Sequence, residues 1–146
     1  MKTMKQALAI LLLGVMLLTL VSCGSSFGTI KKNFTDAGYT YVTQTQEDDA
    51  KANMITAELE EGDISCTVHF FQTKDSITGL IPVYCMVLEF ASDAELQKAL
   101  KDDVSGSATL RGMIEDVQNS EYVRGNCVLV PLSLTKAESM IMIFNK

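Results

Sequence analysis

The stretch LIPVYCMVLEF, residues 80–90, decides the fold of this 146-residue chain. Its apolar side chains fill both odd and even positions, and successive side chains of a strand point to opposite faces of the sheet. A strand over residues 80–90 is therefore apolar on both faces, which is typical of a strand near the centre of a sheet. We expect this central strand to organise the rest of the chain.

The segment before it, MITAELEEGDISCTVHFF, residues 54–71, has a period of two. This alternation predicts two strands joined as a hairpin through residues 61–63. On the second strand one face is apolar and consists of Ile64, Cys66, Val68 and Phe70. The other face carries Ser65, Thr67 and His69, so we expect His69 to point outward into solvent.

Helices are predicted on both sides of these strands. Ile30, Phe34 and Ala37 recur at helical spacing before Gly38, which predicts a helix over residues 29–37, followed by an extended segment YTYVTQ. After the central strand, Ser92 and Glu95 form a capping box that begins another helix. A third helix carries the apolar residues Leu110, Met113, Ile114 and Val117 on one face.

The C-terminal part predicts one more strand and one more helix. YVRGNCVLVPL, residues 122–132, reads as a strand that Pro131 ends. Thr135 and Glu138 then form a second capping box, which predicts a closing helix. Residues 140–144 are also compatible with a strand. Helices before, between and after one antiparallel block indicate an α+β fold: a sheet of about four or five strands with helices mostly on one face.

The N-terminus has the pattern of an export signal. Lys2 and Lys5 precede an uncharged apolar run over residues 7–21, too short at about 22 Å to span the roughly 30 Å of a bilayer core. The residues Leu20, Val21, Ser22 and Cys23 that follow resemble the lipobox of bacterial lipoproteins. This resemblance covers residues 1–23 and implies cleavage before Cys23 and a diacylglyceryl group on its thiol.

The resemblance divides the chain into a signal peptide (1–22), a lipidated cysteine with a short linker (23–28) and a single α+β domain (29–146). The remaining chain also resembles uncharacterised small lipoproteins of Gram-positive bacteria. In those proteins an aromatic-rich strand leads into an acidic, alanine-rich helix, and a G-N-x-V strand follows. This likeness supports the fold and the location, and it brings no catalytic residues with it.

Charge limits the partners of the domain. Loss of Lys2 and Lys5 with the signal peptide leaves ten basic residues against eighteen acidic ones, a net charge of −8. Binding to nucleic acid requires clustered Lys and Arg, so we do not expect it. The same charge argues against attraction of the whole domain to anionic lipid, and the expected contact with the membrane is the lipid on Cys23.

Three cysteines remain besides Cys23, and each lies in an apolar segment. We expect Cys66, Cys85 and Cys127 to be buried free thiols, which behave as small hydrophobic residues. One disulfide with one odd thiol is the first alternative, and a metal site is the second. No two of them have C-x-x-C spacing.

Candidate catalytic residues are few, since His69 is the only histidine. It lies three residues from Cys66 and therefore on the opposite face of the strand, although pairing with Cys85 or Cys127 across strands remains open. Paired acids at 60–61, 102–103 and 115–116 are expected to be solvated. GSSFG, residues 24–28, fits the G-x-S-x-G pattern but lies in the linker, without the strand and helix that a nucleophile elbow needs.

The sequence therefore predicts a lipid-anchored protein on the extracytoplasmic face of the cell membrane, with Cys23 as the lipidation site and with no catalytic, cofactor or metal residues. We expect it to act as a non-enzymatic binding or accessory module of the envelope, with an envelope protein or a small molecule as partner. The alternative is an envelope hydrolase with a site around His69. A cleft in which His69 meets a cysteine or carboxylates would favour the hydrolase.

Overall fold

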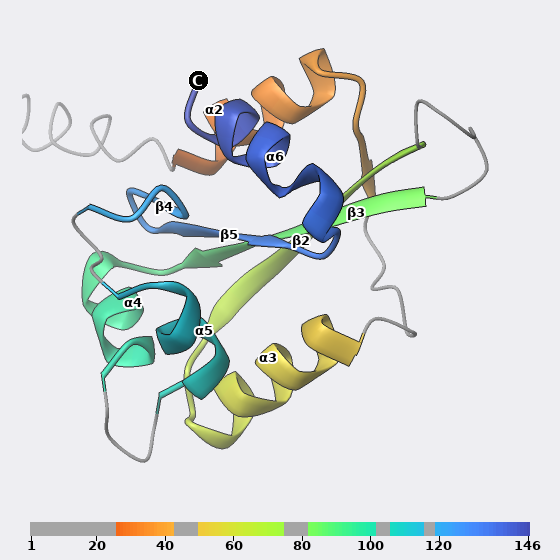
Figure 1. The fold of residues 1–146 in the computed structure, drawn as a ribbon. Coiled ribbons are helices and arrows are strands. Elements are labelled where there is room, and N and C mark those ends of the chain that lie inside the picture. Colours follow the sequence, from red (N-terminus) through yellow and green to blue (C-terminus); the bar gives the residue numbers. More distant parts are fainter. Residues whose placement is uncertain (1–25, 43–49, 75–81, 102–105, 116–118) are drawn as a thin grey trace, which may run out of the picture.

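The computed structural model describes residues 26–42, 50–74, 82–101, 106–115 and 119–146. The expected signal peptide with Cys23 lies outside the described residues, as do Val117 and the acids Asp102, Asp103 and Asp116. Where the chain is described, it forms one antiparallel sheet covered by helices (Figure 1). The predicted α+β class and the size of the sheet are confirmed.

The sheet has five strands in the order β1-β2-β3-β5-β4. Their bounds are β1 (Thr40–Val42), β2 (Cys66–Lys74), β3 (Pro82–Phe90), β4 (Val123–Arg124) and β5 (Cys127–Pro131). β3 pairs with β2 over its whole length and with β5 from Cys85 to Glu89. The prediction that residues 80–90 hold the central strand is therefore confirmed, with Pro82 as the first residue of the strand.

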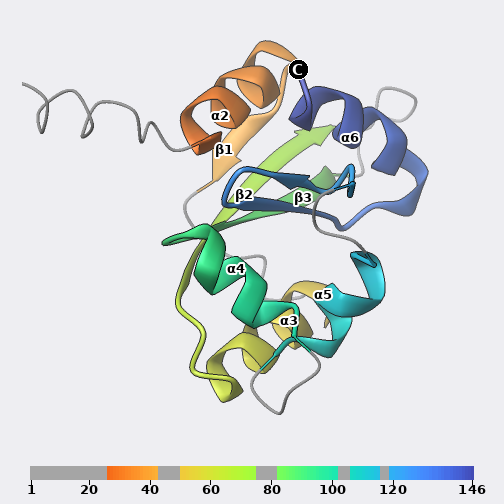
Figure 2. The ribbon, with the colours of Figure 1, turned by 90° about the vertical axis from the view of Figure 1, so that its left-hand side faces the viewer.

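The helices form two layers, one on each face of the sheet (Figures 1 and 2). The α2–α6 layer contains α2 (Ser26–Asp36), the 3-10 helix η1 (Leu134–Lys136) and α6 (Ala137–Phe144). The α3–α5 layer contains α3 (Ala50–Glu61), α4 (Asp93–Ala99) and α5 (Ala108–Met113). Three of the described α-helices thus cover one face of the sheet and two cover the other, so helices lie on both faces.

Alternation along the strands separates the core into two clusters. Even-numbered residues of β2, β3 and β5, such as Phe70, Met86 and Val128, pack against the α3–α5 layer. Odd-numbered residues, such as Phe71, Val87 and Leu129, pack against the α2–α6 layer. A covered second face follows directly from a central strand that is apolar on both sides.

The predicted strand over residues 54–60 is wrong, because these residues belong to helix α3. Ile55, Ala57 and Leu59 alternate as in a strand, but Ala57 is exposed, whereas Ala52, Ile55 and Leu59 are buried. The buried positions i, i+3 and i+7 follow helical spacing. Asp63 ends the helix in a left-handed conformation with φ 52°, and the turn at 61–63 therefore joins a helix to β2 rather than two strands.

The predicted strand over residues 122–132 consists of two strands. Arg124 pairs with Cys127, so Gly125 and Asn126 form a two-residue turn between β4 and β5. Gly125 has a φ of 58°, which fits a type II′ turn with glycine at its first central position. Pro131 ends β5 as predicted.

The helix termini agree with the predictions in two cases and differ in a third. Ser92 caps α4 by accepting a hydrogen bond from the Glu95 amide at 3.3 Å, and Gly38, at φ 88°, follows the end of α2. The closing helix is confirmed as α6, which excludes a strand over 140–144. Its predicted capping box is wrong: the N-cap is Lys136, because η1 already includes Thr135.

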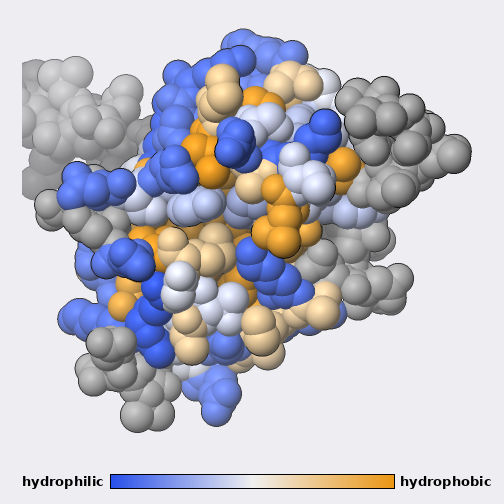
Figure 3. All heavy atoms as spheres, viewed as in Figure 1, coloured by the Kyte–Doolittle hydropathy of each residue, from blue (hydrophilic) through white to orange (hydrophobic). Residues whose placement is uncertain are grey.

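Three large apolar side chains of the described residues are exposed, namely Met54, Leu134 and Met142. Leu134 and Met142 belong to η1 and α6, and apolar side chains are visible in that region of the surface in Figure 3. None of the helices in the described part of the chain combines the length and the hydrophobicity that crossing a bilayer requires.

Candidate functional site

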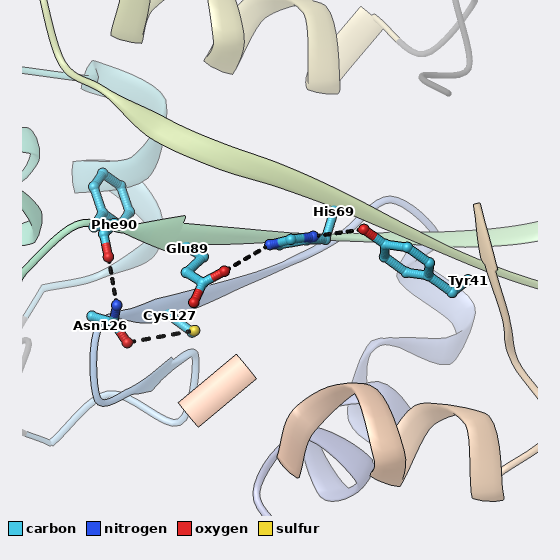
Figure 4. Close-up of polar contacts among 6 residues, drawn as sticks. All are labelled: Tyr41, His69, Glu89, Phe90, Asn126 and Cys127. Carbon is cyan, nitrogen blue, oxygen red and sulfur yellow. Dashed lines mark hydrogen bonds and ion pairs between the residues drawn. The ribbon is translucent and has the colours of Figure 1, made fainter. Parts of the chain in front are cut away.

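His69 lies in the middle of a polar cluster that spans three strands (Figure 4). Its Nε2 atom is 3.0 Å from Glu89 Oε2 on β3, and its Nδ1 atom is 2.9 Å from the Tyr41 hydroxyl on β1. Glu89 pairs with Thr67 and Tyr41 pairs with Phe71, so both are diagonal neighbours of His69 on the same sheet face. The register of β1, β2 and β3 therefore assembles the cluster.

The hydrogen bonds determine where the proton of the imidazole lies. A carboxylate only accepts, so Nε2–H donates to Glu89, and Nδ1 then accepts from the Tyr41 hydroxyl. Burial, opposed by Glu89 and assisted by Lys31, lowers the pKa of His69 below its ordinary value. His69 is accordingly a neutral imidazole at pH 7, with its one donor and its one acceptor both paired.

Helix α2 covers the cluster. The Phe27 ring stacks on the His69 ring with centroids 3.5 Å apart and planes tilted by 15°, and the Lys31 ammonium lies 4.1 Å above the centre of the Tyr41 ring. Only 6% of His69 is exposed. His69 is therefore enclosed under the first turns of α2, whereas Tyr41 and Glu89 beside it are half-buried.

The expected outward orientation of His69 is thus wrong. Its place on the face opposite Cys66 is confirmed, because Cys66 packs against the core under the α3–α5 layer, whereas His69 stacks on Phe27 of the α2–α6 layer. Ser65 and Thr67, on the same face as His69, are exposed, but the face becomes buried from His69 to Phe71 where α2 packs on it. Residues 26–28, expected as linker, form the first turn of α2. The covering residue Phe27 comes from that turn.

Cys66, Cys85 and Cys127 are free thiols, as predicted. Cys85 and Cys127 are also buried, whereas Cys66 is only half-buried. Burial raises the pKa of Cys66 to about 11 and that of Cys127 to about 12, and it raises the pKa of Cys85 as well. Cys127 lies on the same sheet face as Glu89, and its thiol points to the Asn126 side chain at 3.8 Å. Such thiols stay protonated at neutral pH and are poor nucleophiles.

The acidic pairs do not form a site within the described residues. Glu60 and Glu61 are exposed on α3, and Glu115 is exposed after α5. No group of three or more His, Cys, Asp or Glu side chains that could hold a metal ion exists in the described ranges. Among the described residues, Gly38, Thr40, Gln72 and Thr73 line a hollow of about 340 Å³, and His69 is not one of them.

Sequence reasoning missed Phe27, Tyr41 and Glu89. Glu89 is the one acidic residue of an otherwise apolar central strand, and Phe27 is an aromatic residue among small ones. An acid in an apolar central strand is expected to need a polar partner, and the chain has a single histidine, so the pairing of His69 with Glu89 could have been predicted. The contribution of Phe27 depends on the position of α2, which no local pattern indicates.

Comparison with protein-family models, with curated proteins and with solved structures finds no match to this chain. The function is therefore argued from the residues and their geometry.

Proposed function

We propose that the chain is a lipid-anchored protein of the extracytoplasmic face of the cell membrane that acts as a non-enzymatic binding or accessory module. The anchor is the lipid on Cys23, which the lipobox pattern supports. Two or three acyl chains hold a protein stably on a bilayer, whereas one chain does so only marginally. The excess of acidic residues argues against nucleic acid as the partner.

One observation carries the non-enzymatic part of the proposal: both nitrogens of His69 are hydrogen-bonded to protein atoms beneath Phe27. A general base must come within hydrogen-bond distance of the proton that it abstracts from a substrate. Neither nitrogen of His69 is free for this, and only 6% of the residue is exposed. The cluster therefore fits a structural role better than a catalytic one.

The alternative function, an envelope hydrolase around His69, has one observation in its favour. A carboxylate does meet the imidazole, since Glu89 lies 3.0 Å from Nε2 and orients the ring as in a catalytic relay. In that reading the Tyr41 hydroxyl would present the reactive oxygen. One contact argues against the hydrolase: the Lys31 ammonium lies over the Tyr41 ring and covers it.

Anchoring is tested by labelling with a radioactive fatty acid. Wild type should incorporate the label, whereas Cys23→Ala should not. Cys66→Ala is the matched control, because it removes a thiol that lies in the folded domain. Equal incorporation into the wild type and Cys23→Ala would rule out the lipoprotein assignment.

The two functions are separated by His69→Gln, whose amide can still donate to Glu89 and accept from Tyr41 but transfers no proton at neutral pH. Complementation of a deletion phenotype by this variant at normal protein levels supports the binding module. Complete failure to complement, with thermal unfolding unchanged, would favour the hydrolase.

A further inference from the structure

The N-terminal end of the described domain, at Ser26 and Phe27, packs closely against the rest of the fold. Ser26 packs so closely on the β4–β5 turn that a Cβ atom on Gly125 would lie 2.2 Å from its hydroxyl oxygen. Phe27, the next residue, stacks on His69. Ser26 lies three positions after Cys23 in the sequence, a reach of about 11 Å at full extension. The α2–α6 layer therefore begins within a short tether of the proposed lipid.

Charge is divided unevenly between the two layers in the described residues. The α2–α6 layer with the C-terminal residues carries four lysines (Lys31, Lys32, Lys136 and Lys146) against the side chains of Asp36 and Glu138. The α3–α5 layer with its flanking turns carries seven acidic side chains against four basic ones. Among the described residues, the acidic excess thus lies on the layer farther from the tether.

Exposed apolar side chains follow the same division. Leu134 on η1 is 86% exposed and Met142 on α6 is 69% exposed. Met140 and Phe144, each two residues from Met142, are buried against the sheet, so Met142 points away from the core. Apolar side chains flanked by lysines are typical of surfaces that lie on a bilayer.

We propose that the α2–α6 layer is a membrane-contacting face: its lysines lie against the anionic headgroups, and Leu134 and Met142 insert among them. This inference rests on the proposed lipidation of Cys23, which brings the face to the bilayer. The acidic α3–α5 layer then points away from the membrane, because anionic lipid repels it. The domain has one fixed orientation, with the α3–α5 layer open to a partner.

The test places a fluorophore on each layer of the lipidated full-length protein. Met142→Cys and Met54→Cys replace exposed methionines on α6 and α3, and the native thiols are buried or half-buried. The labelled proteins are reconstituted on vesicles of phosphatidylglycerol and phosphatidylethanolamine that contain brominated acyl chains. Fluorescence at position 142 should be quenched at least twofold more than at position 54.

Equal quenching at the two positions, or stronger quenching at position 54, would overturn the proposed orientation. Phosphatidylcholine vesicles with the same brominated chains should reduce the quenching at position 142, and unchanged quenching would contradict the role of the lysines. Flotation with the vesicles reports the lipid anchor separately. If the wild type fails to float, the lipidation itself is wrong, whereas a protein that floats without differential quenching refutes the orientation alone.

Discussion

The two helical layers pack on opposite faces of the same strands, but they are built differently. The α3–α5 layer covers an apolar face, and two of its helices, α4 and α5, begin at the side-chain caps Ser92 and Ser107. The α2–α6 layer covers aromatic residues together with the cluster of Tyr41, His69 and Glu89. One strand can thus have a purely hydrophobic face and a face that also needs hydrogen bonds.

The separation into two layers predicts that core mutations act locally. Phe34→Ala, in α2, removes a ring stacked 4.8 Å from Phe71 and should lower the free energy of unfolding by about 3–5 kcal/mol. Chemical denaturation measures this loss. Hydrogen exchange should accelerate in α2 and α6 more than in α3–α5, because Phe34 belongs to the core cluster between the α2–α6 layer and the sheet.

Leu96→Ala, in α4, is the matched control for the other layer. Leu96 is 1% exposed, and its truncation should cost about 2–5 kcal/mol and accelerate exchange in α3–α5 instead. Identical exchange patterns in the two variants would mean that the layers unfold as one unit.

The next largest effect is expected for His69→Ala, which leaves Glu89 and Tyr41 without their shared partner. We expect a loss of about 2 kcal/mol, well above the roughly 0.5 kcal/mol of a surface substitution. Wild-type stability should also fall as the pH drops below about 6.5, because the lowered pKa of His69 favours the neutral form in the folded state. Thermal unfolding between pH 5 and 8 measures both effects.

The contribution of His69 to this pH dependence should disappear in His69→Gln. A wild-type protein whose stability stays constant from pH 8 to pH 5 would contradict the burial of a neutral imidazole. Persistence of the same slope in the variant would assign the effect to another group.

The smallest loss of stability is expected for the substitution of Glu58 in the α3–α5 layer. Burial alone would raise the pKa of Glu58, but hydrogen bonds from Ser107 at 2.6 Å and from the Thr109 amide and hydroxyl at 3.0 and 2.9 Å lower it. Glu58→Gln should cost about 1 kcal/mol at pH 7. This stabilisation is present above about pH 4.5 and is lost below it.

Urea denaturation at pH 7 and at pH 3.5 measures the contribution of Glu58. The difference between wild type and variant should shrink at the lower pH, and a constant difference would contradict an ionised Glu58. Glu60→Gln, at an exposed position of the same helix, should leave stability unchanged.

The sequence by itself determined the central strand, the even-numbered core face, the cap at Ser92 and the class of the fold. These features depend on residues that are close in the chain, where periodicity and capping reveal them. The same local reasoning failed at residues 54–60, since Ile55, Ala57 and Leu59 satisfy a strand period, while the burial of Ala52, Ile55 and Leu59 satisfies a helical one. Only packing against the sheet decided between the two.

The tertiary structure alone decided the environment of His69. Tyr41, His69 and Glu89 are brought together by strand register, and Phe27 is brought to them by the docking of α2. Strand alternation predicts which residues lie on the same face of the sheet, but it does not predict whether a distant helix covers that face. The physical reason is that burial is a property of the assembled layers, and residues 26–31 become a cover for His69 only once α2 has packed on the sheet.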